Sequence, residues 1–331
     1  MTVPHDDRSV SLLLKEGKDA LYRDEHSVAE SLGEEVLARA RGEADPALVD
    51  EALALVADSR RLMGQFAHSL ITLAQLVNEA DNSDTTRSYA LLALSNFVEC
   101  AIHLSLSRDK IDAFVSHAEA EAKTLDTDWL KSRILLQKSR VLRDRHDFGR
   151  ASEAAVRSLW FASHAAGQNL IYAMHCYQQA VARSMLDMGD IGNAYLRYQE
   201  ILTDSGTSLW AKVCGHIGLS RVLLARGQTV EAVNHSTLAI AEAHHMNPLA
   251  VTYAIEASYD AYQSAGDEEM AAKAARDLLF YTARCDSVHR RYKALIRAAE
   301  MSMLPEGADD EMARLERRLI ESCGFADGLA L

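Results

Sequence analysis

Proline and glycine are scarce in this chain of 331 residues, which has only 4 Pro and 16 Gly. Both residues interrupt helices, whereas the abundant Ala, Leu, Glu and Arg favour them. No stretch combines period-two alternation with enough β-branched residues to predict a strand. The composition therefore predicts helix over nearly the whole chain.

Long apolar runs are also absent. No run reaches 18 apolar residues, and residues 1–7 lack a basic region followed by an apolar one. These features argue against a membrane-spanning helix and a secretory signal. The 5 cysteines are far apart and form no C-x-x-C pair, which is typical of free thiols in a reducing compartment. We therefore expect a cytoplasmic protein.

Positive charge is in deficit, with a formal net charge of -13. A negative field repels phosphate backbones and anionic lipids, so we expect neither nucleic acid nor a membrane as partner.

The common nucleotide-binding, zinc-protease and serine-hydrolase motifs are missing. His244 and His245 are adjacent and would point about 100° apart on a helix. We expect no metal, no cofactor and no enzymatic activity.

A turn followed by a small residue recurs along the chain. In one instance, Gly189-Asp190 forms the turn and Ala194 is the small residue. Equivalent small residues recur roughly every 40 residues, as in other helical repeats: Ala29, Ser69, Ala113, Ala151, Ala194, Ala232 and Ala271. Earlier in each unit a second small residue occurs: Gly17, Ala57, Ala101, Ser139, Ala182 and Ser220. Two small residues allow antiparallel helices to pack closely, so each unit is predicted to be a helical hairpin.

Helix breakers separate the predicted hairpins. Asp45-Pro46 and Asn247-Pro248 are two examples, and they combine an N-cap residue with a proline suited to the first helical turn. We expect a frayed N-terminus at 1–9, a repeat array at 10–285, two capping helices at 286–323 and a short tail at 324–331.

These units resemble the tetratricopeptide repeat, which also has a small residue in its first helix, a turn of the Gly-Asp type and an Ala five residues later. The resemblance covers residues 10–285. Repeats of this length are similar to the extended repeats of bacterial signalling proteins, such as the maltose-regulon activator and Rap-type peptide-regulated proteins. The resemblance implies an all-α, right-handed α-solenoid of about seven hairpins plus a C-terminal capping helix pair. Its inner groove, lined by the first helix of each pair, would hold a peptide or partner segment.

One position of the first helix faces the groove in that family. Here the series is Lys18, Asp58, Ile102, Arg140, Arg183, Arg221 and Asp260. Guanidinium groups bind carboxylates through paired hydrogen bonds. We therefore predict a partner-binding groove for an acidic segment, formed by Arg133, Arg140, Arg143, Gln179, Arg183 and Arg221. The alternative is that these arginines pair with acids of neighbouring repeats or stay solvated.

The pattern favours a non-catalytic interaction scaffold or regulatory adaptor. One alternative is the sensory region of a bacterial signalling protein such as a nucleotide cyclase. Another is a Rap-type regulator that senses a peptide. A homodimer formed through the last helices is left open by the sequence.

Overall fold

The structure, a computed structural model, describes residues 9–323 apart from 44, 80–83, 125–127, 166–169 and 205–206. The predicted tail and nearly all of the predicted frayed N-terminus lie outside these residues. Within the described part, the chain forms sixteen helices and no strand. None of these helices combines the length and apolar character needed to span a membrane.

The helices of the first half are α1 (Val10–Tyr22), α2 (His26–Glu43), α3 (Pro46–Leu62), α4 (Phe66–Glu79), α5 (Asp84–His103), α6 (Arg108–Thr124), α7 (Asp128–Asp144) and α8 (Phe148–His164). Those of the second half are α9 (Leu170–Asp187), α10 (Ile191–Thr203), α11 (Leu209–Ala225), α12 (Thr229–Ala243), α13 (Pro248–Ala265), α14 (Glu268–Thr282), α15 (Val288–Glu300) and α16 (Ala308–Cys323).

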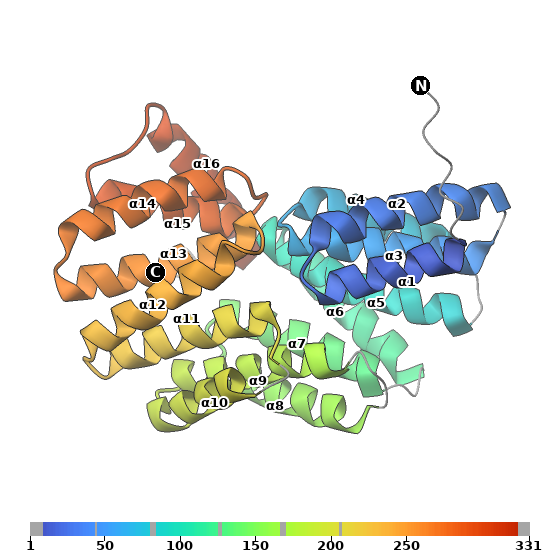
Figure 1. The fold of residues 1–331 in the computed structure, drawn as a ribbon, viewed down its shortest axis with the longest axis horizontal. Coiled ribbons are helices and arrows are strands. Elements are labelled where there is room, and N and C mark those ends of the chain that lie inside the picture. The colour runs from blue at the N-terminus through green and yellow to red at the C-terminus, as the bar shows by residue number, and fades with distance from the viewer. Residues whose placement is uncertain are drawn as a thin grey trace.

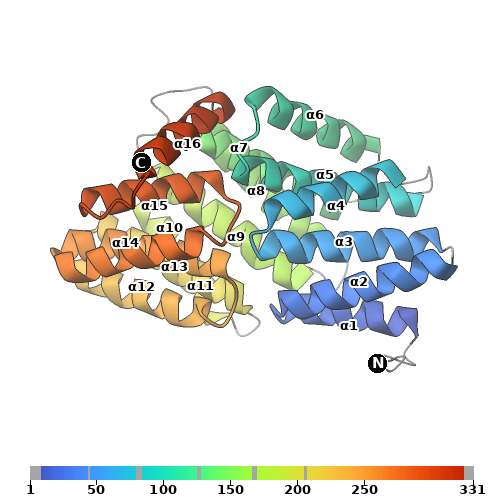
Figure 2. The ribbon, with the colours of Figure 1, turned by 90° about the horizontal axis from the view of Figure 1, so that it is seen from above.

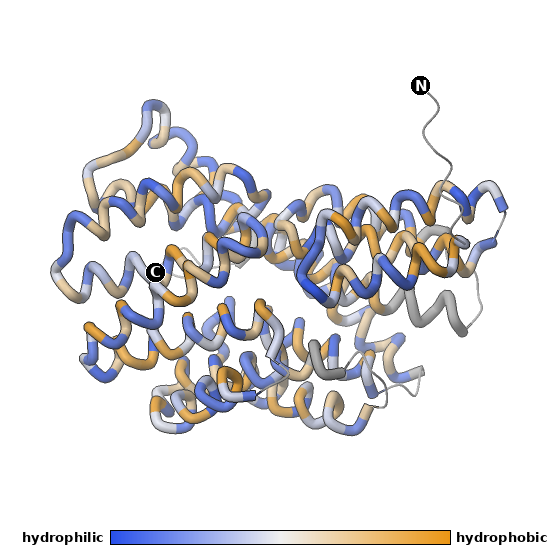
Figure 3. Tube along the Cα trace, viewed as in Figure 1, coloured by the Kyte–Doolittle hydropathy of each residue, from blue (hydrophilic) through white to orange (hydrophobic). Residues whose placement is uncertain are grey.

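Each helix packs mainly against the next one in the chain, so the molecule is a stack of antiparallel helices (Figure 1). Apolar and polar residues alternate along the helices (Figure 3), as expected when one face of each is buried. The buried side chains form a series of clusters along the stack, each shared by neighbouring helices. These features confirm the prediction of an all-α solenoid.

The predicted breakers act as helix caps. The side chains of Asp45 and Asn247 accept hydrogen bonds from backbone N–H groups of the first turn of α3 and α13, at 3.2 and 2.9 Å. Pro46 and Pro248 follow at the first helical position, where their missing N–H costs nothing. At the end of α13, Gly266 adopts a left-handed conformation with φ of 71°, which glycine reaches without strain.

A left-handed residue marks the turn within each pair: Asp24, Gly64, Ser105, His146, Gly189, Gly227 and Gly266. The left-handed turn residue identifies equivalent positions of different repeats more reliably than the small residues do. Six of the predicted small residues after the turn are buried, but Ala113 is exposed, and Ile111 is the buried residue near the start of α6. The prediction for the third unit was therefore wrong. Because α6 begins one residue later after its turn than its counterparts do, the equivalent position is Ile111, and Ala113 lies two residues beyond it.

The correction changes one residue of the groove series. Counting back from Ser105 as in the other units, the third member is Glu99 and not Ile102. The series therefore reads Lys18, Asp58, Glu99, Arg140, Arg183, Arg221 and Asp260.

The solenoid curves until its last helices touch its second and third pairs, which lie beside them in Figures 1 and 2. The N–H of Asp286 donates to the carbonyl of Gly64 at 3.0 Å, and its carboxylate accepts from the N–H of Ala67 at 3.2 Å. His103 Nδ1 and Ser287 Oγ form a hydrogen bond of 3.0 Å, and α16 contacts α6. The last helices of the chain therefore lie against its second and third pairs, across the curve of the solenoid.

Candidate functional site

The odd-numbered helices line the inner face. α3 packs against α5, α9 against α11, and α11 against α13, whereas no even-numbered helix of the described chain packs to that extent against the next even-numbered one. Elements on the inside of a curve lie closer together than those on the outside. The residues Asp58, Glu99, Arg140, Arg183, Arg221 and Asp260 therefore follow one another along the concave side, one on each odd-numbered helix from α3 to α13.

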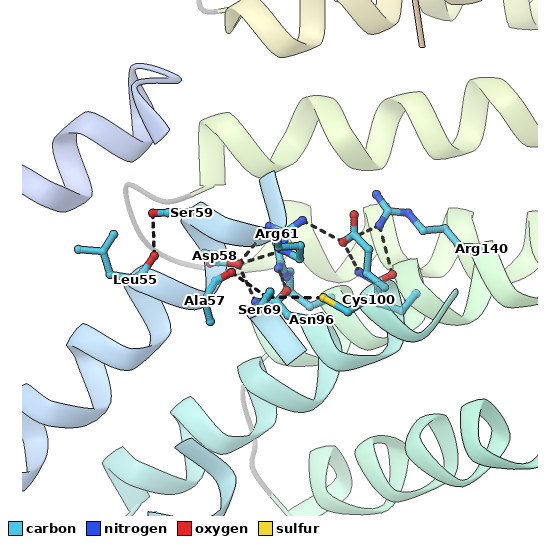
Figure 4. Close-up of polar contacts among 12 residues, drawn as sticks. Leu55, Ala57, Asp58, Ser59, Arg61, Ser69, Asn96, Cys100 and Arg140 are labelled. Carbon is cyan, nitrogen blue, oxygen red and sulfur yellow. Dashed lines mark hydrogen bonds and ion pairs between the residues drawn. The ribbon is translucent and has the colours of Figure 1, made fainter. Parts of the chain in front are cut away.

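Arg140 is already paired with an acid of the preceding repeat. Its guanidinium lies 2.8 Å from a carboxylate oxygen of Glu99. Arg61 shares the same carboxylate at 3.0 Å and also pairs with Asp58 at 3.1 Å (Figure 4). Arg140 therefore pairs with an acid of a neighbouring repeat, which was the alternative to a role in partner binding.

The pKa values in this network show how tightly its charges are coupled. Burial alone would raise the pKa of the Glu99 carboxyl, but the charges of Arg140 and Arg61 outweigh burial and hold that pKa well below its usual range. Burial would likewise lower the pKa of Arg61, yet Glu99 and Asp58 raise it. The network is thus ionised and internally compensated.

Arg133 belongs to the same network. It donates to the side-chain oxygen of Asn96 at 2.5 Å, and the Asn96 amide donates to Asp58 at 2.7 Å. Gln179, by contrast, hydrogen-bonds to the thiol of Cys214, whose pKa is raised by burial. Sequence reasoning missed Arg61, Asn96 and Glu99. Glu99 joins the series only because the structure identifies Ser105 as the left-handed turn residue of its unit.

Three of the predicted arginines form few or no ion pairs with described residues. Arg183 donates through Nε to Asp187 at 3.0 Å, but its buried Nη1 has no hydrogen-bond partner in the described part of the protein. Arg143 and Arg221 make no hydrogen bond or ion pair with any described residue, although Asp144 lies near Arg143, and Glu256 and Asp260 lie near Arg221. Burial, together with the charges of Arg221 and Arg143, lowers the pKa of Arg183 to about 10. We call Arg143, Arg183 and Arg221 the arginine cluster.

Two hollows lie elsewhere on the surface. One, of about 490 Å³, lies among α12, α13 and α14, and its charged residues Lys273 and Asp277 face each other at 3.8 Å. The other, of about 430 Å³, includes Asp260, which pairs with Arg297 at 3.0 Å. Among the described residues, no three His, Cys, Asp or Glu side chains gather in a way that could hold a metal ion. The arginine cluster is therefore the strongest candidate for a binding site on the inner face.

Comparison with solved structures places the fold. A Rap protein complexed with competence and sporulation factor matches with a TM-score of 0.66 and 14% identity, over 96% of this chain and 89% of that one. The apo quorum sensor NprR from B. thuringiensis matches with a TM-score of 0.53 and 14% identity, over 95% and 93%. A signal-transduction ATPase with a tetratricopeptide-repeat sensor, from Pyrococcus horikoshii, matches with a TM-score of 0.54 and 13% identity, over 94% and 47%.

No family model matches the chain, and no curated protein matches its sequence. At such low identities the structural matches establish the fold alone. The helical pairs, their left-handed turns and these matches together show that the chain has the fold of a tetratricopeptide-repeat-like solenoid.

Proposed function

We propose that this protein is a non-catalytic regulatory module that binds an acidic peptide or protein segment on its inner face. The observation that carries the proposal is the arginine cluster, in which three guanidinium groups on successive first helices form an ion pair with only one described acid, Asp187. Guanidinium groups that are partly removed from water bind anions more strongly than exposed ones do. A concave surface with such a cluster suits an extended acidic segment.

The structural neighbours support this proposal. A Rap protein with a similar fold is complexed with competence and sporulation factor, and NprR is a quorum sensor. Both have the same kind of solenoid fold. From these neighbours we take only the use of the repeat fold for recognition. The expected chemistry of the partner, an acidic segment, is inferred from the arginine cluster.

The test is selection from a random peptide library displayed on phage, with the protein immobilised at low salt. We expect enrichment of peptides rich in Asp and Glu, with affinity that falls as salt rises, because exposed charges are screened within about 10 Å at 0.1 M salt. The matched control is Arg157→Gln, since Arg157 lies on α8 and is 59% exposed. This variant should bind the enriched peptides as the parent protein does. If no peptides are enriched, or if the enriched peptides show no preference for acids, the proposal fails.

A second candidate is the sensory region of a larger signalling protein. It is favoured by the match to the signal-transduction ATPase, of which this chain spans 47% and whose repeats are described as a sensor. Both candidates use the same inner face. They differ in whether binding changes the activity of an output domain, which activity assays of the full gene product with and without a selected peptide would measure.

A further inference from the structure

The repeat allows a comparison of two arginines in equivalent places. Arg61 on α3 and Arg143 on α7 each lie three residues before the left-handed residue of their turn, Gly64 and His146. Each is therefore flanked by the groove position of its own helix and by that of the next odd-numbered helix. Repeats of one solenoid present equivalent positions in similar surroundings.

The flanking charges differ completely between the two places. Around Arg61 the two groove positions are Asp58 and Glu99, and both carboxylates pair with it at 3.1 and 3.0 Å. Around Arg143 they are Arg140 and Arg183. An arginine surrounded by acids in one repeat is thus surrounded by arginines two repeats later.

Only part of this second group is compensated within the chain. Arg140 has its partner in Glu99, and Asp187 is the one described carboxylate that forms an ion pair with the arginine cluster. Asp144 lies near Arg143 without forming an ion pair with it. Glu256 and Asp260 lie near Arg221 but pair with other cations, so the positive charge of the cluster is only partly neutralised. Like charges held together in a partly buried place raise the free energy of the unliganded state, and a bound dianion would remove that cost.

We propose that the arginine cluster binds a phosphoryl group, either on a side chain of the peptide segment proposed above or on a small phosphorylated molecule. A phosphoryl group carries a charge of about −1.5 to −2 at pH 7 and has three strong acceptor oxygens. It therefore offers one acceptor oxygen to each of the three guanidinium groups and more negative charge than one carboxylate, which supplies a single charge and two oxygens. This inference rests on the proposed use of the inner face for binding.

The first test measures the melting temperature of the protein in phosphate, sulfate and acetate at pH 7.5 and equal ionic strength. At ten times Kd, a bound dianion should raise the melting temperature by about 2 °C, and acetate should not. The rise should disappear in Arg183→Gln and shrink in Arg143→Gln and Arg221→Gln, while Arg157→Gln should keep it. Equal effects of phosphate and acetate, or an undiminished rise in all three variants, would overturn the proposal.

The three single variants protect the test against misfolding of any one of them. Because the cluster costs stability when unliganded, Arg143→Gln and Arg221→Gln should melt no lower than the parent protein in acetate. Arg183→Gln also removes the ion-pair partner of Asp187 and should melt somewhat lower. A large loss of stability in all three would show that the cluster is structural, and would also overturn the proposal. Phosphate binding should weaken as the pH falls through about 6 to 7, where the dianion gains a proton, and sulfate binding should not.

A second measurement separates the two sources of the phosphoryl group. Fluorescence anisotropy would compare a labelled phosphoserine peptide with the same peptide containing serine, with O-phosphoserine as competitor. We expect the phosphopeptide to bind at least tenfold more tightly if a segment is the ligand, whereas binding of O-phosphoserine alone would indicate a small molecule. If selected acidic peptides bind with no dependence on the cluster, this inference fails while the proposed function stands.

Discussion

Replacing Glu99 by Gln should destabilise the protein, because this carboxylate is the shared counter-charge of Arg61 and Arg140. The side chains of Glu99 and Arg61 are only 15% and 10% exposed, so water compensates little for the loss. Removing one partner of a fully buried pair costs about 3–5 kcal/mol. Asp58 still neutralises Arg61, and Arg140 is 31% exposed, so we expect a smaller loss of about 2–3 kcal/mol.

The assay is thermal unfolding followed by circular dichroism at 222 nm, with Glu153→Gln as the matched control, since Glu153 is 69% exposed. The Glu99→Gln protein should melt about 3–4 °C lower than the parent, and the control within about 1 °C. If both variants melt like the parent, the network contributes no stability and Arg140 would again be a candidate for partner binding.

The pH dependence follows from the same carboxylate. The pKa of Glu99 is lower in the folded protein than in the unfolded chain, where it is about 4.3. Its contribution is therefore present above pH 5 and is lost as the pH falls below about 4. The difference in stability between the parent and Glu99→Gln should shrink over that acidic range, and a constant difference from pH 7 to pH 3 would contradict the assigned ionisation.

Three further predictions concern packing and closure. Ala194→Leu and Ala232→Leu place extra methylenes at fully buried positions and should each cost about 1–3 kcal/mol; unchanged melting temperatures would mean that the helix register is wrong. Gly218→Ala should cost a similar amount, because a Cβ there would lie 2.2 Å from a buried tyrosine ring, whereas Gly192→Ala, with no atom within 4 Å, should change the melting temperature little. Asp286→Ala removes one exposed hydrogen bond between the last helices and the second pair and should cost about 0.5–1.5 kcal/mol without changing the radius of gyration in X-ray scattering, because the bonds to Gly64 and between His103 and Ser287 remain; a larger radius would mean that this one bond holds the curve closed.

The helical pairs could be predicted from the sequence because their signals are local. Asp45-Pro46 and Asn247-Pro248 act as caps through their own backbone geometry, and Gly189 and Gly266 adopt the left-handed turn that glycine favours. In the third unit the left-handed residue is Ser105, which carries no comparable signal, so the neighbouring small residue Ala113 led to the wrong register.

The sequence could not predict which arginines of the candidate site pair with acids of the chain, because this pairing depends on contacts between residues distant in the sequence. Arg140 and Arg183 occupy equivalent positions, and their sequence neighbourhoods do not show that only the first meets an acid of the preceding repeat. The sequence analysis did not identify that acid, Glu99, because it placed Ile102 at the equivalent position of the third unit. The closure of the curve through Asp286 and Gly64 likewise depends on the accumulated twist of several repeats, which no single repeat specifies.

A crystal structure of the protein with an acidic or phosphorylated peptide obtained by selection would test the central claim most directly. We predict that the peptide lies along the inner face formed by the odd-numbered helices, with its anionic oxygens within about 3.2 Å of the guanidinium nitrogens of Arg143, Arg183 and Arg221. A peptide bound to the outer helices, or one on the inner face whose acidic groups lie away from all three arginines, would contradict the account.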